Sequence, residues 1–311
     1  MTGTILIYGA TGYTGELISR EAARRGLAPI LAGRSPEKVA ALARRLSRET
    51  GTQLQHRTFD VEDAAAHLAD TDVLLNCAGP FQRTAPAMVE ACLGTGTHYV
   101  DITGEIGVLA HCHERDGRAR EKGVVLLPGA GFDVVPTDSL AAAVASHLPD
   151  ATELDIAFDG VGTASIGTIT TMVENLGAGG MIRRGGELQS VPLAYRTRQI
   201  PFPGRTGLGV TIPWGDVFTS GVSTGVPNGM VYMGTSPRAV RLQKVMRLVG
   251  PLVGSDIVQR VLLALVQRFL PAGADSEELR TRRARIWAEA RNAAGERVVG
   301  TMTTPHPYAL T

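Results

Sequence analysis

The sequence predicts a doubly wound α/β domain followed by a second, α+β domain. Three observations support this. Short β-branched runs alternate with helical stretches over the first 130 residues, a glycine-rich turn follows the first apolar run, and the composition shifts after about residue 150. We expect a dinucleotide-binding domain at 1–135 and a substrate or dimerisation domain at 136–311.

The first half of the chain contains strand and helix signals in strict alternation. Helix 36–49 shows the signals most fully, because Ser35 stands at its N-cap and Pro36 at its first position. Strands are predicted at 4–8, 29–32, 53–59, 73–76, 99–102 and 124–127. Helices are predicted at 14–25, 36–49, 62–68, 85–93 and 108–122.

The second half is richer in Gly, Pro and Thr, and its signals are less regular. A hairpin of 281–291 with 297–303 is the clearest, because apolar and polar residues alternate along its first arm. Its edge could pair across a homodimer. Strands are also predicted at 153–158, 217–219 and 230–233, and helices at 166–176, 237–249 and 256–270.

Composition excludes several classes of protein. Lys and Arg total 31 against 30 Asp and Glu, so the net charge of +1 creates no field that attracts nucleic acid. The three cysteines form no CxxC pair, which argues against a disulfide framework or a metal site and fits a cytoplasmic protein. The N-terminus lacks the features of a signal peptide, and no run reaches the 18 apolar residues of a membrane span.

The turn after the first strand has the form of a Rossmann phosphate-binding turn. It consists of Gly9, Ala10, Thr11, Gly12, Tyr13, Thr14 and Gly15. Gly9 permits the tight turn, Gly12 lets the backbone approach a pyrophosphate, and Gly15 lets helix and strand pack closely. The pyrophosphate would sit at the helix N-terminus. The alternative is a purely structural βα turn.

The end of the second strand favours NADP over NAD. An NAD site needs an acidic residue about 20 positions after the glycines. This strand ends instead at Arg34 and Ser35. A guanidinium can bind a 2′-phosphate through two parallel hydrogen bonds, and a hydroxyl can add another. The alternative for Arg34 is an ordinary exposed arginine before a helix cap.

The ends of the third and fourth strands complete the predicted cofactor site. Asp60 follows the third strand, where it can meet the adenine or cap the next helix. Cys77, Ala78, Gly79 and Pro80 follow the fourth strand. Their small size would let the nicotinamide ribose lie against the backbone.

Several motifs together resemble the saccharopine dehydrogenase-like oxidoreductases, a family that includes trans-acting enoyl reductases. They are Gly-Ala-Thr-Gly-Tyr-Thr-Gly at 9–15, Ala-Gly-Arg-Ser at 32–35, Asn-Cys-Ala-Gly-Pro-Phe at 76–81, and the segments 98–105 and 129–138. The resemblance is specific over 1–140 and implies an NADP-binding Rossmann domain with a second α+β domain. Relatives usually continue beyond a Tyr-x-x-Thr motif, here 308–311, where this chain stops.

Carboxylates are the main candidates for proton transfer. No lysine follows a tyrosine at the Tyr-x-x-x-Lys spacing of short-chain reductases. Asp101 and Glu105 flank the end of the predicted strand 99–102, and Asp133 lies in a later loop. All three are placed on the side where α/β sites form, and each could instead cap a helix. Asp138 suits capping better than catalysis. Adjacent helical residues point in different directions, so the His-Cys-His run at 111–113 predicts no metal site.

We therefore expect an NADP-dependent oxidoreductase that transfers a hydride to a substrate lying between the domains. An acyl or enoyl thioester is favoured, because the arginines of 153–234 lie in loose Gly- and Pro-rich sequence rather than in a carboxylate clamp. The alternatives are a saccharopine-type C–N oxidoreductase, a non-catalytic NADP-binding regulator and a lipid-surface scaffold. The basic amphipathic helices 237–249 and 256–270 could contact an anionic carrier or membrane surface, or simply pack on the second sheet.

Overall fold

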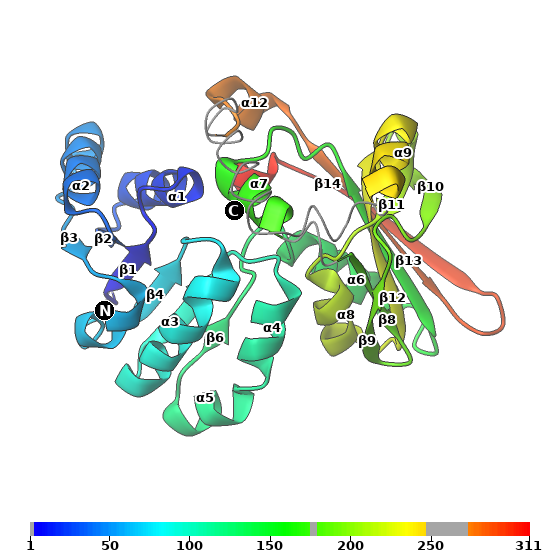
Figure 1. The fold of residues 1–311 in the computed structure, drawn as a ribbon, viewed down its shortest axis with the longest axis horizontal. Coiled ribbons are helices and arrows are strands. Elements are labelled where there is room, and N and C mark those ends of the chain that lie inside the picture. Colours follow the sequence, from blue (N-terminus) through cyan, green and yellow to red (C-terminus); the bar gives the residue numbers. More distant parts are fainter. Residues whose placement is uncertain (1–2, 175–178, 247–272) are drawn as a thin grey trace. The chain divides into compact units, whose positions relative to one another are not determined.

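The computed structural model describes residues 3–174, 179–246 and 273–311 (Figure 1). The chain divides into two compact units, Met1–Gly131 with Thr311, and Phe132–Leu310. Helix 256–270 of the sequence analysis lies outside the described residues. Within the described segments, no helix combines the length and apolar character needed to cross a membrane.

The first unit is built on a parallel sheet in the order β3-β2-β1-β4-β5-β6. Its strands are β1 (Ile5–Tyr8), β2 (Ile30–Gly33), β3 (His56–Thr58), β4 (Val73–Asn76), β5 (His98–Asp101) and β6 (Leu126–Leu127). The order reverses between β1 and β4, and such reversals mark ligand crevices in open α/β sheets. The predicted doubly wound sheet is confirmed.

Helices cover both faces of this sheet because successive strand residues point to opposite sides. Leu6 packs in one core with Met88 of α3, while Ile7 packs in the other with Leu42 of α2. The helical elements are α1 (Tyr13–Arg24), α2 (Pro36–Thr50), the 3₁₀ helix η1 (Val61–His67), α3 (Phe81–Thr95), α4 (Ile106–His113) and α5 (Asp116–Lys122).

Most helices and strands predicted for this unit from local sequence signals are present in the structure. Ser35 Oγ accepts the Lys38 backbone N–H and so caps α2, and Gly51 ends that helix in the left-handed region at φ 75°. The single helix expected at 108–122 is wrong, because the chain breaks between α4 and α5. Arg115, at that break, forms an ion pair with Glu90 of α3.

The second unit contains a mixed sheet in the order β10-β11-β12-β7-β13-β14, with β8 paired to β12 and β9 to β8. Its strands are β7 (Glu153–Asp159), β8 (Gly180–Arg184), β9 (Glu187–Val191), β10 (Thr197–Phe202), β11 (Arg205–Thr211), β12 (Asn228–Thr235), β13 (Ala284–Arg291) and β14 (Arg297–Thr304). The predicted C-terminal hairpin is β13–β14.

Helix α6 covers one face of this sheet. It packs against β13 and β14, where a Cβ at Gly300 would come within 2.6 Å of Val144, and α8 packs beside it. The helices of this unit are α6 (Val135–Ser146), α7 (Ile166–Glu174), α8 (Asp216–Thr224), α9 (Pro237–Met246), α12 (Ser276–Thr281) and α13 (Pro307–Leu310). The strand expected at 217–219 is wrong, since these residues lie in α8.

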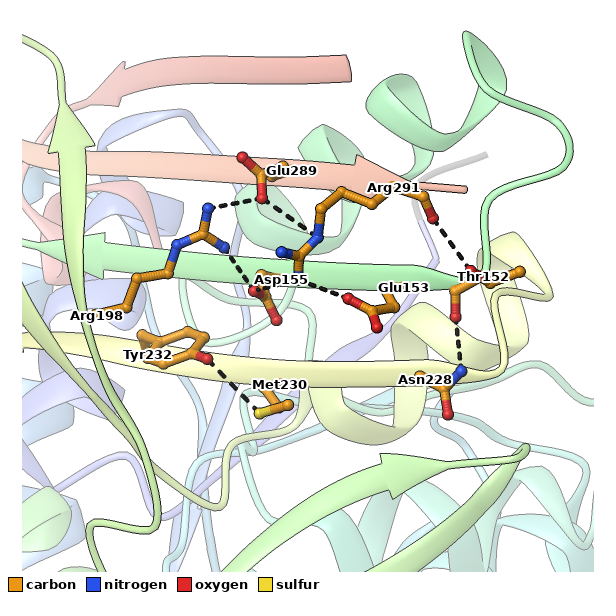
Figure 2. A network of polar contacts seen from close by, with 9 residues as sticks. All are labelled: Thr152, Glu153, Asp155, Arg198, Asn228, Met230, Tyr232, Glu289 and Arg291. Atoms are coloured by element: carbon orange, nitrogen blue, oxygen red, sulfur yellow. Dashed lines mark hydrogen bonds and ion pairs between the residues drawn. The ribbon is translucent and has the colours of Figure 1, made fainter. Parts of the chain in front are cut away.

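The opposite face carries a network of buried charges (Figure 2). Asp155 on β7 and Glu289 on β13 are paired in register, and the Arg198 guanidinium of β10 lies 2.6 Å from an oxygen of each. Arg291 lies 3.2 Å from the Asp155 carboxylate. The Arg198 guanidinium also lies over the Trp287 ring, 4.7 Å from its centroid. This charge cluster joins three strands of the sheet.

Candidate functional site

The glycine turn between β1 and α1 is as tight as the sequence predicts. Gly9 has φ 75°, and a Cβ there would lie 2.7 Å from the Ala78 backbone nitrogen. A Cβ at Gly15 would collide with the Gly9 carbonyl oxygen. The Cys77 N–H donates to the Tyr8 carbonyl at 2.8 Å, which holds the turn against the end of β4. Side chains at these two glycines would push strand and helix apart.

Gly12 differs from its neighbours because a side chain there meets little protein. Its backbone is extended, at φ −75° and ψ 163°, and an added Cβ would touch only the Gly9 carbonyl oxygen, at 3.3 Å. Gly12 is the N-cap of α1, and no described side chain caps this helix. The N-terminus of α1 thus fits a pyrophosphate, which the backbone N–H groups and the helix dipole stabilise.

The carboxyl end of β2 presents an exposed cation. Arg34 follows β2, and among the described residues no hydrogen bond or ion pair holds its guanidinium. It lies near Tyr8, whose hydroxyl donates to the Phe59 carbonyl at 3.0 Å. Burial raises the pKa of Tyr8 to about 12, although the positive charge of Arg34 opposes this shift. Arg34 is thus available for a 2′-phosphate, beside the capping hydroxyl of Ser35.

Asp60 stands at the N-cap of η1, but its side chain makes no capping hydrogen bond there. The alternative that Asp60 caps the following helix is therefore wrong. Its position after β3 leaves the predicted adenine contact as a hypothesis.

Small residues after β4 are held by a buried amide. Asn76 Oδ1 accepts the Ala78 N–H at 3.0 Å, and Asn76 Nδ2 donates to Thr84 Oγ1 at 3.0 Å and to the Tyr99 hydroxyl at 3.3 Å. Burial raises the pKa of the neighbouring Cys77 thiol to about 12, so this thiol stays protonated and is a poor nucleophile. The segment suits backbone contact with a cofactor rather than thiol chemistry.

Asp101 has fixed structural partners. The side chain is fully buried and accepts hydrogen bonds from the Tyr99 hydroxyl at 2.7 Å, the Thr103 N–H at 3.0 Å and the Gly129 N–H at 2.8 Å. Burial raises its pKa, while these hydrogen bonds favour the carboxylate. The residue thereby joins β5 to the segments around 103 and 129.

Glu105 likewise holds a helix end. Its two carboxylate oxygens accept the backbone N–H groups of Phe81 at 2.9 Å and Gln82 at 2.7 Å. These are the first residues of α3, which follows the cis peptide bond between Gly79 and Pro80. A carboxylate on exposed backbone donors at a helix N-terminus is a stabilising cap.

Asp133 is the remaining predicted acid, and it belongs to the second unit. It is half-buried just before α6, and its carbonyl accepts the Trp214 indole N–H at 2.6 Å. Burial raises its pKa to about 7. A carboxyl group with this pKa carries its proton in a substantial fraction of molecules at neutral pH, as a general acid requires.

Two further aspartates lie near Asp133. Asp138 accepts the Ser223 hydroxyl at 3.1 Å and makes no cap for α6, so its predicted capping role is wrong. Asp216 is fully buried. Burial raises the pKa of Asp216 well above its usual value, and the charges of Asp138 and Asp133 add to this. Asp216 could not be predicted as a site residue from the sequence, because it opens α8, where no helix is predicted.

The His-Cys-His run at 111–113 lies on α4, where Cys112 is buried in the core and His113 is exposed. Among the described residues, no three His, Cys, Asp or Glu side chains are arranged to hold a metal ion.

Comparison with known proteins connects this geometry to a family. Residues 5–127 match the family model for the saccharopine dehydrogenase NADP binding domain. A saccharopine dehydrogenase-like oxidoreductase of Mus musculus is 29% identical over 151 residues, covering 43% of this chain and 35% of that protein. The "Lipid droplet localized protein" of Caenorhabditis elegans is 29% identical over 145 residues, covering 43% and 34%.

A third relative shares a longer region. The "Putative trans-acting enoyl reductase Rv2449c" of Mycobacterium tuberculosis is 31% identical over 191 residues, covering 55% of this chain and 44% of that protein. The matched region therefore spans less than half the length of each of these relatives.

Proposed function

Residues 5–127 belong to the saccharopine dehydrogenase NADP-binding domain family, whose cofactor is NADP, and on this premise we propose that the protein is an NADP-dependent reductase of acyl thioesters. The expected family and cofactor are confirmed. The substrate proposed is a 2-enoyl thioester.

The extent of one alignment carries the choice of substrate. The similarity to the enoyl reductase covers 55% of this chain, about 171 residues. The first unit consists of residues 1–131 and Thr311, so the matched region is longer than this unit. The similarity to the mouse protein covers 43%, about 134 residues. The likeness to the enoyl reductase therefore includes residues of the second unit.

Two arginines of the second unit are held by partners within the protein. The prediction that Arg183 and Arg198 lie in loose sequence is wrong, since they lie on β8 and β10. Arg183 is buried and donates to the Val226 and Val217 carbonyls. Arg198 is held by the charge cluster of Figure 2. Neither is available to clamp a substrate carboxylate.

Each residue of the proposal has a distinct role. Bound NADPH supplies the hydride. The N-terminus of α1 at Gly12 would hold the pyrophosphate, and Arg34 with Ser35 the 2′-phosphate. Asp133 is the proposed proton donor, because Asp101 and Glu105 already accept hydrogen bonds that fix the loops around them.

The test follows NADPH oxidation with two substrate series, 2-enoyl thioesters of increasing chain length and saccharopine-type imines. We expect turnover of the thioesters, with kcat/KM rising with chain length. Turnover of the imines alone, or no gain with chain length, would overturn the acyl proposal in favour of a C–N oxidoreductase. Tight NADPH binding without turnover of either series would favour a non-catalytic regulator.

A lipid-surface contact is a second, separable proposal. On α9, Leu242 is 62% exposed and Val245 is 58% exposed, and Arg238 and Arg241 lie on the same helix. Exposed apolar residues beside cations are typical of interfacial helices. Sedimentation with anionic vesicles should recover the wild type and lose a Leu242→Glu variant. Equal recovery of both would show that this helix makes no such contact.

A further inference from the structure

An arginine-rich cavity of about 400 Å³ lies in the second unit at the carboxyl end of β7. Its walls include Asp159, Arg205, Arg282, Arg283 and Arg285. Neither the cofactor site nor the proposed acid uses these residues. Four guanidinium groups around one cavity are unusual because like charges repel, and such clusters commonly serve to bind an anion.

The sheet brings these residues together from three distant segments. Arg285 on β13 stands opposite Asp159 on β7 in the strand register. Arg205 begins β11, directly after the turn that joins it to β10. A Cβ at Gly234 would lie 2.7 Å from Asp159 Oδ1, so the glycine leaves space for the aspartate. The cluster is therefore a consequence of strand pairing.

The one carboxylate among the four lining arginines does not satisfy them. Asp159 Oδ2 lies 2.9 Å from Arg205 and 3.7 Å from Arg285, yet it has no hydrogen-bond partner in the described structure. Asp159 Oδ1 accepts the Gly160 N–H at 2.7 Å. Each guanidinium carries five N–H donors. None of those of Arg205 or Arg285 is aligned for a hydrogen bond to Asp159 Oδ2.

The charge balance of the cavity favours an anion. Among the residues that line the cavity, four arginines face the single carboxylate of Asp159. Arg282 pairs with Glu278 at 2.8 Å and Arg283 donates to the Arg280 and Arg282 carbonyls, so the unmatched charge lies at Arg205 and Arg285. Arg205 and Arg282 are about half exposed, at 50% and 49%, which leaves their guanidiniums open to an incoming ligand. A phosphoryl group offers three strong acceptor oxygens, one more than a carboxylate, and suits several converging guanidiniums.

We propose that this cavity binds the phosphoryl groups of a coenzyme A thioester. The chemical group that the cavity would recognise is a phosphoryl oxyanion. The choice of coenzyme A as the molecule that carries it rests on the acyl-thioester function proposed above. The acyl group would then be held through its carrier, separately from the contacts of its apolar chain.

Calorimetric titration at saturating NADPH tests the site directly, because the dinucleotide then blocks its own phosphate-binding turn. We expect binding of inorganic pyrophosphate and of coenzyme A, weaker binding of dephospho-coenzyme A, and none of pantetheine, which lacks those phosphates. Affinity should fall as salt is raised, because half-exposed ion pairs are screened. This wild-type series needs no variant, and equal binding of pantetheine and coenzyme A would overturn the proposal.

A double variant, Arg205→Gln with Arg285→Gln, localises the site. We expect its affinity for coenzyme A to fall about tenfold or more, since two charge-assisted contacts are lost. Arg297→Gln, at the far end of the β13–β14 hairpin, removes an exposed charge from the same unit and should leave affinity unchanged. An unchanged affinity in a folded double variant would overturn the site, as would competition by L-glutamate equal to that by pyrophosphate.

The two proposals fail in different ways. Arginine-dependent coenzyme A binding without thioester turnover would retain the site and reject the reductase. Thioester turnover with an unaltered KM in the double variant would retain the reductase and reject the site.

Discussion

Replacing Arg198 with methionine should destabilise the second unit by about 3 kcal/mol at pH 7. Arg198 lies 2.6 Å from Asp155 and 2.6 Å from Glu289, whose exposures are only 4% and 3%. Removing one partner of a buried pair costs about 3–5 kcal/mol, because the remaining charge stays buried and uncompensated. We take the lower end because Arg291 also lies near both carboxylates, at 3.2 and 3.5 Å.

The destabilisation caused by Arg198→Met should become smaller as the pH falls. Burial already raises the pKa of Asp155 in the folded protein, against the attraction of Arg291 and Arg198. Loss of Arg198 raises this pKa further above the unfolded value of about 3.9. A carboxyl whose folded pKa is raised destabilises the fold by its full amount above that pKa. This cost falls as the pH drops through the folded pKa, and it disappears below the unfolded pKa. The difference from wild type should therefore decrease between pH 7 and about pH 4.

Urea unfolding followed by tryptophan fluorescence provides the assay. Both tryptophans of the chain, Trp214 and Trp287, lie in the second unit, so the signal reports on the unit that carries the substitution. Arg184→Met is the matched control, since this arginine is exposed and should change stability by less than about 0.5 kcal/mol. A loss below about 1 kcal/mol at pH 7, or one that does not shrink at pH 5, would refute the reasoning.

Three further predictions concern the cofactor and the acid. Arg34→Ala should weaken NADPH binding about ten- to a hundredfold and leave NADH nearly unchanged, and equal losses in a titration would contradict a 2′-phosphate contact. Gly12→Val should abolish NADPH binding with an unchanged circular dichroism spectrum, whereas Gly15→Val should disturb the fold as well. If Asp133 is the proton donor, turnover should fall as pH rises through about 7, and Asp133→Asn should remove that dependence. If Asp133→Asn kept the wild-type dependence of turnover on pH, Asp133 would be excluded as the proton donor.

The first unit could be predicted from the sequence because its signals are local. The Ser35 cap and the glycine that ends α2 act within a few residues of the helix they bound. The β13–β14 hairpin could be predicted for the same reason, since alternation along β13 and a short turn determine its pairing. Elements defined by neighbours in sequence need little knowledge of the tertiary fold.

The failures came where tertiary packing overrides local preference. The run of Val, Phe and Thr at 217–219 predicts a strand, yet it forms part of α8, which packs on α6 and ends at Gly225 in the left-handed region. Spacing also could not separate catalysis from structure at Asp101 and Glu105. Either role requires a carboxylate near a strand end, and only the hydrogen-bond partners distinguish them.

The charges on β7 show why the arginine-rich cavity could not be found from the sequence. Asp155 and Asp159 lie on the same face of this strand, because side chains of alternate residues share a face. Near Asp155, Arg198 and Arg291 meet Glu153, Asp155 and Glu289, so cations are fully matched by carboxylates. Near Asp159, the balance reverses and arginines are in excess. Strand β7 thus carries a network of matched charges at its Asp155 end and an excess of arginines at its Asp159 end. Only the excess of arginines leaves hydrogen-bond donors for a ligand.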